Sequence, residues 1–171
     1  IEGKVAEGDI VEVVDNAGKF LATGHYQIGS IAVRVLSFTP EPVNHNFWFS
    51  RIEKAYNLRK SLGLISETNN TYRLVHGEGD NMPGLIVDIY DDTAVMQAHS
   101  VGMHYAKDIL AGAIVKLVTG VKNVYYKSET TLPFKAPVNP EDSYITGIDT
   151  KNYIATENGL KFKMDWLKGQ K

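Results

Sequence analysis

The stretch Tyr72–Tyr90, Y-R-L-V-H-G-E-G-D-N-M-P-G-L-I-V-D-I-Y, organises the rest of the chain. Its two apolar ends, residues 72–76 and 85–90, are rich in β-branched and aromatic residues, which favours two strands. The loop between them contains three glycines and a proline, so its backbone has a defined shape. The Met-Pro-Gly sequence at 82–84 predicts a tight turn, because proline fixes one torsion angle and glycine supplies a positive one. The residues alone therefore predict a structural hairpin.

The loop of this hairpin has two carboxylates, Glu78 and Asp80, which can cap backbone amides or meet a partner. A single G-x-G is weak evidence for a phosphate-binding loop, and no helix is expected to begin after it. We therefore favour a structural role for the loop. The residues expected to shape it are Arg73, Gly77, Glu78, Gly79, Asp80 and Gly84.

The composition is that of an ordinary globular protein. The chain has 171 residues, 43% of them hydrophobic and 22% charged, with a formal net charge of −2 at pH 7. This length allows one domain or two small ones. A nucleic-acid binder of this charge must gather its cations on one face. The absence of cysteine excludes disulfides and thiolate metal sites and agrees with a cytoplasmic location.

The ends of the chain and its apolar runs bear on targeting. No apolar run approaches the roughly 20 residues that span a bilayer, so no membrane partner is expected. The chain starts with Ile1 rather than Met, and its first residues do not form a signal peptide. We expect it to be cut from a longer protein.

Residues 1–38 have an all-β pattern. Strands are expected at 9–14, 20–23 and 31–38, with a turn at 16–18. Both faces of the third strand are largely apolar, as in a small closed barrel. A unit of under roughly 40 residues seldom folds alone, so further strands are expected upstream.

Residues 39–68 are expected to form a proline-bearing linker and a helix over 47–62, with Asn44 or Asn46 as N-cap and Gly63 after its end. Apolar residues at spacings of three and four predict the buried face: Trp48, Ile52, Ala55, Leu58 and Leu62. Basic residues occupy the other sides: Arg51, Lys54, Arg59 and Lys60. A solvated helix face is the favoured interpretation of these cations, and an RNA-facing role is the alternative.

The second half, residues 69–171, predicts an α+β domain. After the hairpin we expect a strand at 93–99, a helix at 105–119 and a strand at 123–126, giving a sheet with helices on one side. Residues 128–149 are expected to be a long loop. Asn158-Gly159 predicts a final hairpin between strands at 153–157 and 160–166. One face of its last strand is apolar: Leu160, Phe162, Met164 and Trp166.

No motif for self-sufficient catalysis is present. Of the five histidines, only His99 and His104 are close in sequence, and their spacing of five is not that of a helical metal pair. The chain has no nucleophile elbow, no Walker phosphate loop and no cluster of zinc ligands. We therefore expect neither a catalytic residue nor a metal site.

Five sequence strings resemble a known family. V-x-E-G-D-I-V-E-V-V-D-N-x-G-K-F-L-A-T-G-x-Y, followed by I-x-V-R-V-L-S, resembles the RNA-binding PUA domain at the front of a family of bacterial S-adenosylmethionine-dependent RNA methyltransferases. The best-known members of this family make 5-methylcytosine in large-subunit ribosomal RNA. The strings F-W-x-x-R-I-E-K-A, Y-R-L-V-H-G-E-G-D-x-x-P-G-L-I-V-D-x-Y and E-N-G-L-K-F-K-M-D-W-L-K-G-Q-K are similar to its central α/β domain. The resemblance covers nearly the whole chain, although Lys127 stands where many members have arginine.

The resemblance implies a fragment of a longer enzyme. It implies that the chain begins inside the PUA domain and that residues 168–171 lead into a Rossmann-like methyltransferase domain, which carries the cofactor pocket and the attacking cysteine of 5-methylcytosine enzymes. The fold class expected is thus α+β: a partial PUA-like barrel at 1–38, the linker and helix at 39–68, and a central domain with a terminal hairpin at 69–171. The catalytic domain is expected to be absent. The intact parent would use S-adenosylmethionine, whereas the fragment would bind no cofactor and be inactive alone.

Two functions follow from the resemblance. In the first, the fragment recognises ribosomal RNA and positions the missing methyltransferase domain; in the second, it is a purely structural connector without RNA contact. A contiguous basic stripe across the surface would favour RNA. The residues expected to contact RNA are Lys19, His25, Tyr26, Arg34, Arg51 and Lys54, with core packing as an equal alternative for Tyr26. In the central domain, Arg73, Glu78 and Asp80 are expected to fix the loop or the neighbouring catalytic domain. The cut ends are expected to leave exposed strand edges through which the fragment self-associates.

Overall fold

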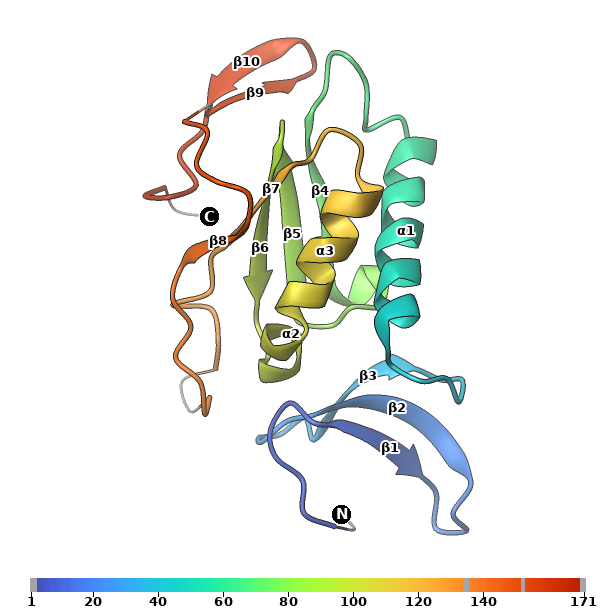
Figure 1. The fold of residues 1–171 in the computed structure, drawn as a ribbon. Coiled ribbons are helices and arrows are strands. Elements are labelled where there is room, and N and C mark those ends of the chain that lie inside the picture. The colour runs from blue at the N-terminus through green and yellow to red at the C-terminus, as the bar shows by residue number, and fades with distance from the viewer. Residues whose placement is uncertain (1–2, 134–135, 152, 170–171) are drawn as a thin grey trace.

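The computed structural model describes residues 3–133, 136–151 and 153–169 and shows two lobes (Figure 1). A small N-terminal sheet lies at one end of a larger central lobe. The N-terminal sheet has strands β1 Ile10–Val14, β2 Phe20–Tyr26 and β3 Val33–Ser37. The central lobe has strands β4 Thr71–His76, β5 Leu85–Tyr90, β6 Thr93–Ala98, β7 Asn123–Tyr126 and β8 Ser143–Thr146, helices α1 His45–Ser61, α2 Val101–Tyr105 and α3 Lys107–Leu117, and the hairpin β9 Ile154–Glu157 and β10 Leu160–Lys163.

The predicted central hairpin is confirmed as the antiparallel pair β4–β5. Its loop begins with a turn of 3-10 helix, η1 Gly77–Asp80. The loop ends in a tight turn in which the Leu85 amide donates to the Met82 carbonyl at 3.0 Å. Gly84 has a φ of +85°, which is the positive angle that a proline-glycine turn of type II requires.

Around this hairpin the central sheet has the order β4-β5-β6-β7-β8. Only β6 and β7 are parallel, because α2 and α3 cross over between them, and the other neighbours are antiparallel. Two expectations are wrong here. Residues 128–149 are not all loop, since β8 pairs with β7 as a fifth strand. The single helix expected over 105–119 is two helices: α2 starts at Val101 with Ser100 as its N-cap, and α3 follows from Lys107 to Leu117.

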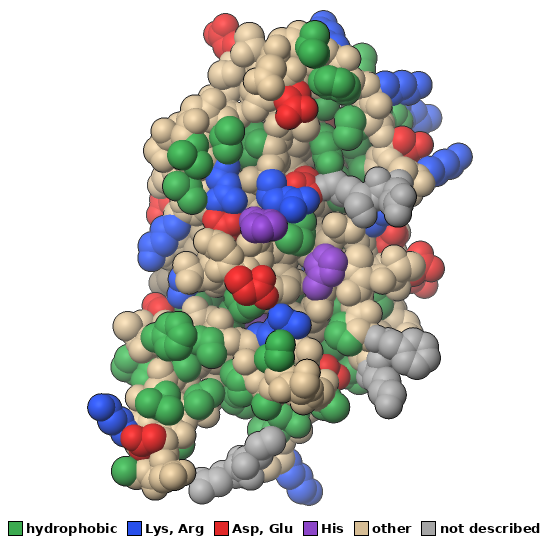
Figure 2. All heavy atoms as spheres, turned by 180° about the vertical axis from the view of Figure 1, so that it is seen from behind, with side chains coloured by type: hydrophobic (Ala, Val, Ile, Leu, Met, Phe, Trp, Pro, Cys, Tyr) green, Lys and Arg blue, Asp and Glu red, His purple; other side chains and the backbone are tan. Residues whose placement is uncertain are grey.

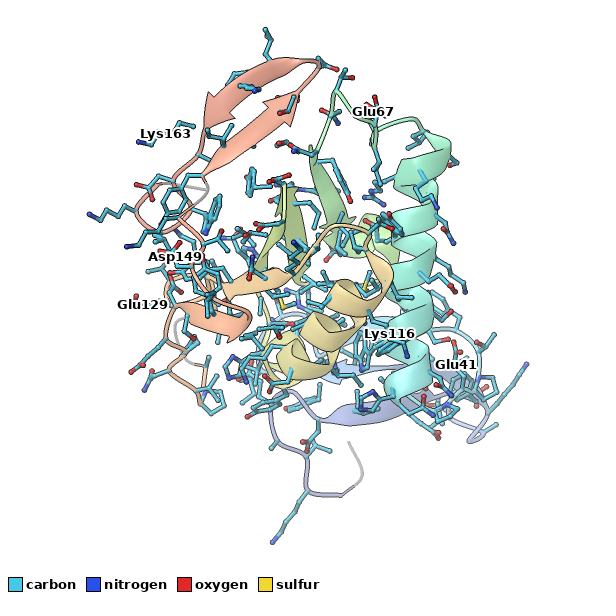
Figure 3. The ribbon with its side chains drawn as sticks, turned by 45° about the horizontal axis from the view of Figure 1, so that its top comes forward. Glu41, Glu67, Lys116, Glu129, Asp149 and Lys163 are labelled. Carbon is cyan, nitrogen blue, oxygen red and sulfur yellow. The ribbon has the colours of Figure 1, made fainter. Side chains whose placement is uncertain are left out.

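The helices cover one face of the central sheet (Figure 1). Lys116 of α3 lies over the ring of Phe49 in α1 at 5.3 Å, and Figure 3 shows Lys116 between the two helices. The predicted face of α1 is confirmed at Trp48, Ile52 and Ala55 but not towards its C-terminal end. Leu58 and Leu62 are exposed, whereas Arg59 is buried. The core between helices and sheet includes Trp48, Ile52, Leu74, Met82, Leu85, Val87, Met96, Met103, Leu110, Ile114 and Tyr126.

The opposite face of the sheet is partly covered by the C-terminal segment. Trp166 packs with Val95 and Tyr125 and stacks on Tyr90 with ring centroids 5.9 Å apart. Trp166 is buried by this chain itself, whereas Leu160 and Phe162 of the same predicted apolar face are exposed. The reason is that β10 ends at Lys163, so the strand alternation does not reach Trp166.

The final hairpin is confirmed around its Asn-Gly turn. Asn158 and Gly159 have φ values of +50° and +80°, as a two-residue turn of this type requires. The hairpin docks on the segment before β4, because the Gly159 amide donates to the Thr68 carbonyl at 2.8 Å. Leu160 and Phe162 of β10 remain exposed, and self-association through such surfaces stays a prediction.

The N-terminal sheet has the order β1-β2-β3 and is antiparallel throughout. The three predicted strands and the turn at Gly18, whose φ is +77°, are confirmed. Within the described residues this unit is an open sheet rather than a closed barrel. Large apolar side chains that stay exposed on it are Ile10, Val14, Leu21, Ile28, Ile31 and Phe38.

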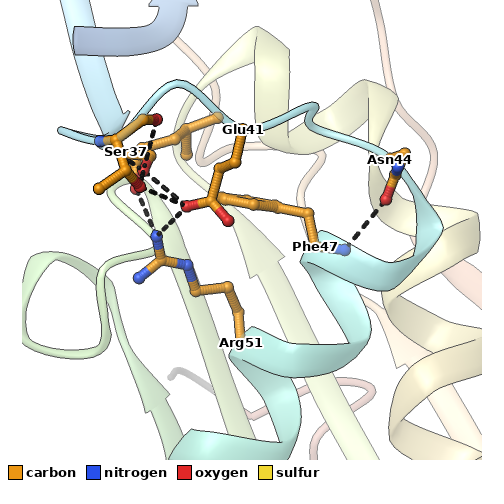
Figure 4. Close-up of polar contacts among 7 residues, drawn as sticks. Ser37, Glu41, Asn44, Phe47 and Arg51 are labelled. Carbon is orange, nitrogen blue, oxygen red and sulfur yellow. Dashed lines mark hydrogen bonds and ion pairs between the residues drawn. The ribbon is translucent and has the colours of Figure 1, made fainter.

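The linker between the lobes is held by polar contacts (Figure 4). Asn44 is the N-cap of α1, since its side chain accepts a hydrogen bond from the Phe47 amide at 3.2 Å. Arg51 donates to the Leu36 carbonyl at 2.9 Å and lies 3.8 Å from the Glu41 carboxylate. Glu41 in turn accepts from the hydroxyl of Ser37 at 2.6 Å. The first residues after β3 are thereby fixed to α1. No helix in the described part of the chain is long and apolar enough to span a membrane.

Candidate nucleic-acid interface

The register of the N-terminal sheet decides which of its side chains meet the central lobe. His25 of β2 lies directly opposite Arg34 of β3, so both side chains leave the same face. That face packs on the central lobe. Tyr26, the next residue, pairs with Val33 and faces the other way, into a hollow of about 790 Å³ that Val11 and Val13 also line.

His25 is the centre of the contact between the lobes. Its ring stacks on Trp48 of α1 with centroids 6.0 Å apart, and its other side lies against Gly102 of α2. His25 is 3% exposed, and its Nδ1 has no hydrogen-bond partner among the residues that the structure describes. Burial lowers the pKa of His25 to about 4, so the imidazole is neutral at pH 7. In this arrangement His25 is buried between the lobes, and its expected contact with RNA stays a prediction.

Arg34 makes the second contact between the lobes. Its Nη1 lies 3.4 Å from Oε1 of Glu78, and its Nε donates to the side chain of Gln27. Glu78 belongs to η1, in the loop of the β4–β5 hairpin. The fold thus brings together a residue expected to bind RNA and a residue expected to shape the loop. Neither motif predicts this pairing, since the two residues are 44 positions apart.

Asp80 holds the same loop against α1. Its carboxylate accepts two hydrogen bonds from the guanidinium of Arg59 and one from the His76 amide, the last at 2.6 Å. Arg59 also donates to the Arg73 carbonyl at 2.9 Å, so it links α1 to both β4 and the loop. The loop is therefore tied to the helix layer by a buried ion pair.

The glycines of the loop are not equivalent. Gly77 and Gly84 have positive φ values of 50° and 85°, which disfavour other residues. A Cβ at Gly84 would also lie 2.8 Å from the Ser100 hydroxyl. Gly79 has neither restriction, since its nearest neighbour would be His76 at 3.7 Å.

Beside this loop, basic and histidine side chains gather on the face opposite the helices (Figure 2). We call this the junction patch; its members are Arg34, Arg73, His76, Glu78 and His99. Arg73 is 46% exposed, with Nη1 3.3 Å from Nδ1 of His76 and Nε 2.9 Å from Asp88. The pKa of His99 is lowered, chiefly by partial burial and then by Arg34, while Glu78 raises it.

The remaining residues expected to contact RNA lie apart from the junction patch. Lys19 is exposed at the β1–β2 turn, and Lys54 is exposed on α1. Arg51 is engaged with the linker, as described above. Arg34 and Arg51 each face a carboxylate, so the described residues do not present one free basic stripe along the lobes.

Two residues with structural roles were not expected from the sequence. Arg59 lies four residues after Ala55, at the spacing of the buried face of α1, but it has the charge of a surface residue. Only this spacing could have indicated its burial. Lys127 donates to the carbonyls of Trp166, Leu167 and Gly169 at 2.6, 3.4 and 2.9 Å. It thereby fixes the course of the C-terminal segment. Among the described residues, no group of three or more histidines and carboxylates could hold a metal ion.

The chain is thus an α+β protein in which a small antiparallel sheet packs against α1, α2 and the β4–β5 loop of a central lobe with a mixed five-stranded sheet. Residues 1–38 match the family model of a PUA-like domain. The whole chain is 33% identical over 173 residues to ribosomal RNA large subunit methyltransferase I of Alteromonas mediterranea. It is 32% identical over 173 residues to the protein of the same name from Vibrio cholerae. The chain spans 43% of the length of each of these curated relatives.

Solved structures share the fold. SMU.776, a protein proposed to be a methyltransferase and solved in complex with SAH, has a TM-score of 0.74 at 18% identity. That match covers 92% of this chain and 39% of the other. A Streptococcus mutans protein proposed to be a SAM-dependent methyltransferase gives a TM-score of 0.73 at 18% identity, over 94% of this chain and 40% of the other. These likenesses establish the architecture of both lobes.

Proposed function

We propose that this chain is the RNA-recognition and domain-positioning portion of a SAM-dependent ribosomal RNA methyltransferase that acts on C5 of cytosine in the cytoplasm. The observation that carries the proposal is the match to two ribosomal RNA methyltransferases over the full length of the chain, with a PUA-like domain at its front. S-adenosylmethionine would be bound by the longer protein rather than by the residues described above.

The structure supports the positioning part of the proposal. The N-terminal sheet is attached to the central lobe at three places: the buried His25, the Arg34–Glu78 pair and the fastened linker. A PUA-like sheet held in this way would present bound RNA in a fixed orientation to whatever follows the central lobe. Lys19 and Tyr26 remain accessible for that RNA on the side of the sheet away from the central lobe.

The second candidate is a structural connector that touches no RNA. It is favoured by the fact that His25, Arg34 and Arg51 all make contacts between or within the lobes. RNA binding by the 171-residue chain separates the two. If the chain recognises RNA, its affinity for a fluorescent ribosomal RNA hairpin will fall steeply between 50 and 200 mM salt, because phosphate contacts release counterions. Absence of binding at the lowest salt would favour the connector.

The methyltransferase assignment has separate tests. Calorimetry of the chain with S-adenosylmethionine should show no micromolar binding, and such binding would contradict the division of roles proposed above. Deletion of the gene should remove one 5-methylcytosine from large-subunit ribosomal RNA, as detected by mass spectrometry of RNA digests. Loss of a different methylated nucleotide would support the methyltransferase assignment but overturn the assignment to C5 of cytosine.

A further inference from the structure

The junction patch is assembled by the topology of the central sheet. Strands β4 and β6 both run antiparallel to β5, so their C-terminal residues lie at the same end of the sheet. His76 pairs with Ile86, and Ile86 pairs with Gln97. The side chains of His76 and Gln97 therefore lie on the same face of the sheet. His99 follows two residues after Gln97, with its amide bound to the Gly84 carbonyl at 2.8 Å. His76 and His99 therefore lie at the same end of the sheet, next to the N-terminal lobe.

Two arginines bring positive charge to this end of the sheet. Arg34 reaches the patch from β3, and Arg73 reaches it from β4. Asp88 is engaged by Arg73 at 2.9 Å, so Glu78 is the carboxylate that faces the other members. The two arginines are balanced by Glu78 and Asp88, so displacement of Glu78 would leave the patch with a positive charge.

The Arg34–Glu78 pair is loosely held on its Glu78 side. Its N–O distance is 3.4 Å, and the Glu78 side chain is 75% exposed. An ion pair in such a solvated position contributes little, typically under about 1 kcal/mol. A phosphate offers Arg34 two oxygens for paired hydrogen bonds, which suits a guanidinium better than one distant carboxylate oxygen.

We propose that the junction patch binds the phosphate backbone of single-stranded RNA, with Arg34 and Arg73 as its fixed cations and Glu78 as the carboxylate that RNA displaces. The inference rests on the proposed function and adds a second RNA-contacting surface to it. RNA held here would cross the seam between the two lobes. His76 lies beside Arg73, and His99 is acted on by the charges of Arg34 and Glu78.

The test measures binding of a fluorescein-labelled 12-nucleotide RNA to the 171-residue chain by anisotropy. Arg34→Ala and Arg73→Ala should each weaken binding about 3- to 10-fold, and each should reduce the dependence of log K on log salt by about 0.7. Glu78→Gln should tighten binding about 2- to 5-fold, since it removes the competing carboxylate. Lys161→Ala is the matched control, because Lys161 is an exposed cation on β10 at the far end of the molecule (Figure 1).

The opposite signs separate RNA binding from lobe docking. Arg34→Ala and Glu78→Gln break the same ion pair, so a merely structural role predicts that both variants lose affinity together. Loss in both, or no change in either arginine variant, would overturn the proposal. If all the patch variants bind RNA as tightly as the wild-type chain, the proposed function stands and the junction patch is not an RNA-binding surface. A wild-type chain that does not bind RNA at 50 mM salt would overturn both.

Protonation provides a second readout. If phosphate lies against His99, lowering the pH from 7.5 to 6 should tighten RNA binding, because the anion favours the charged imidazole. The variant His99→Asn should lose most of this pH dependence while keeping the effect of Glu78→Gln. An unchanged pH profile in His99→Asn would contradict a place for His99 at the phosphate.

Discussion

Arg59 and Asp80 form a buried bidentate ion pair between α1 and the loop of the β4–β5 hairpin, although they are 21 residues apart in the chain. The same carboxylate accepts from the His76 amide, and the same guanidinium donates to the Arg73 carbonyl. All the groups of the pair are thus satisfied in the interior. This relationship makes the loop a rigid base for Glu78 and for the junction patch.

Removal of one partner of this pair should be costly. Asp80→Asn leaves the Arg59 charge buried without its counterion, and loss of one partner of such a pair typically costs about 3–5 kcal/mol. Urea unfolding of the variant should show a lower free energy of unfolding by about that amount. Glu53→Gln, an exposed acid on the same helix, is the control and should change stability little. Equal small effects in the two variants would show that the pair does not hold the loop.

Replacement by alanine should have opposite effects on stability at Gly102, which contacts His25, and at Gly112, which does not. A Cβ at Gly102 would lie 2.2 Å from Cγ of His25, so Gly102→Ala should destabilise the protein by about 1–3 kcal/mol through overpacking of the lobe contact. Gly112 of α3 has open space around its Cβ position, and Gly112→Ala should stabilise by about 0.5–1 kcal/mol as in other helix interiors. Thermal unfolding of both variants checks the signs. Tolerance of alanine at 102 would mean that the lobes dock differently.

His25 also predicts a pH dependence of stability. Its folded-state pKa of about 4 lies below the ordinary value of 6.5, so the unfolded chain binds more protons at acid pH. The free energy of unfolding should therefore suffer no penalty from His25 above pH 6.5. It should fall by up to about 3 kcal/mol as the pH drops from 6.5 to 4. His25→Phe keeps a ring against Trp48 and cannot titrate. Urea unfolding across this window should be less pH-dependent in the variant, and parallel profiles would refute the assignment.

Lys127 should hold the C-terminal segment on the sheet. Lys127→Met keeps the aliphatic stem but removes three hydrogen bonds from the ammonium group. Trp166 should then become more accessible to acrylamide, as measured by fluorescence quenching in a Trp48→Phe background. Lys163→Met is the matched control, because Lys163 is exposed on β10 (Figure 3). Equal quenching in the two variants would remove Lys127 from this role.

The sequence by itself determined the features that depend on neighbouring residues. The Pro-Gly turn before β5, the Asn-Gly turn before β10 and the Asn44 cap of α1 follow from backbone angles and side-chain hydrogen bonds within a few positions. The strands of both lobes follow in the same way from runs of β-branched and aromatic residues.

Tertiary structure decided which faces are buried and which distant side chains meet. β8 is a strand only because β7 offers it an edge, and Arg59 is buried only because Asp80 supplies its counterion. His25 looks like a surface residue until the register of the N-terminal sheet turns it onto Trp48 and Gly102. The physical reason is the same in each case. The free energy of burying a charge or a polar ring depends on partners that lie tens of residues away in the chain, and local sequence patterns do not contain them.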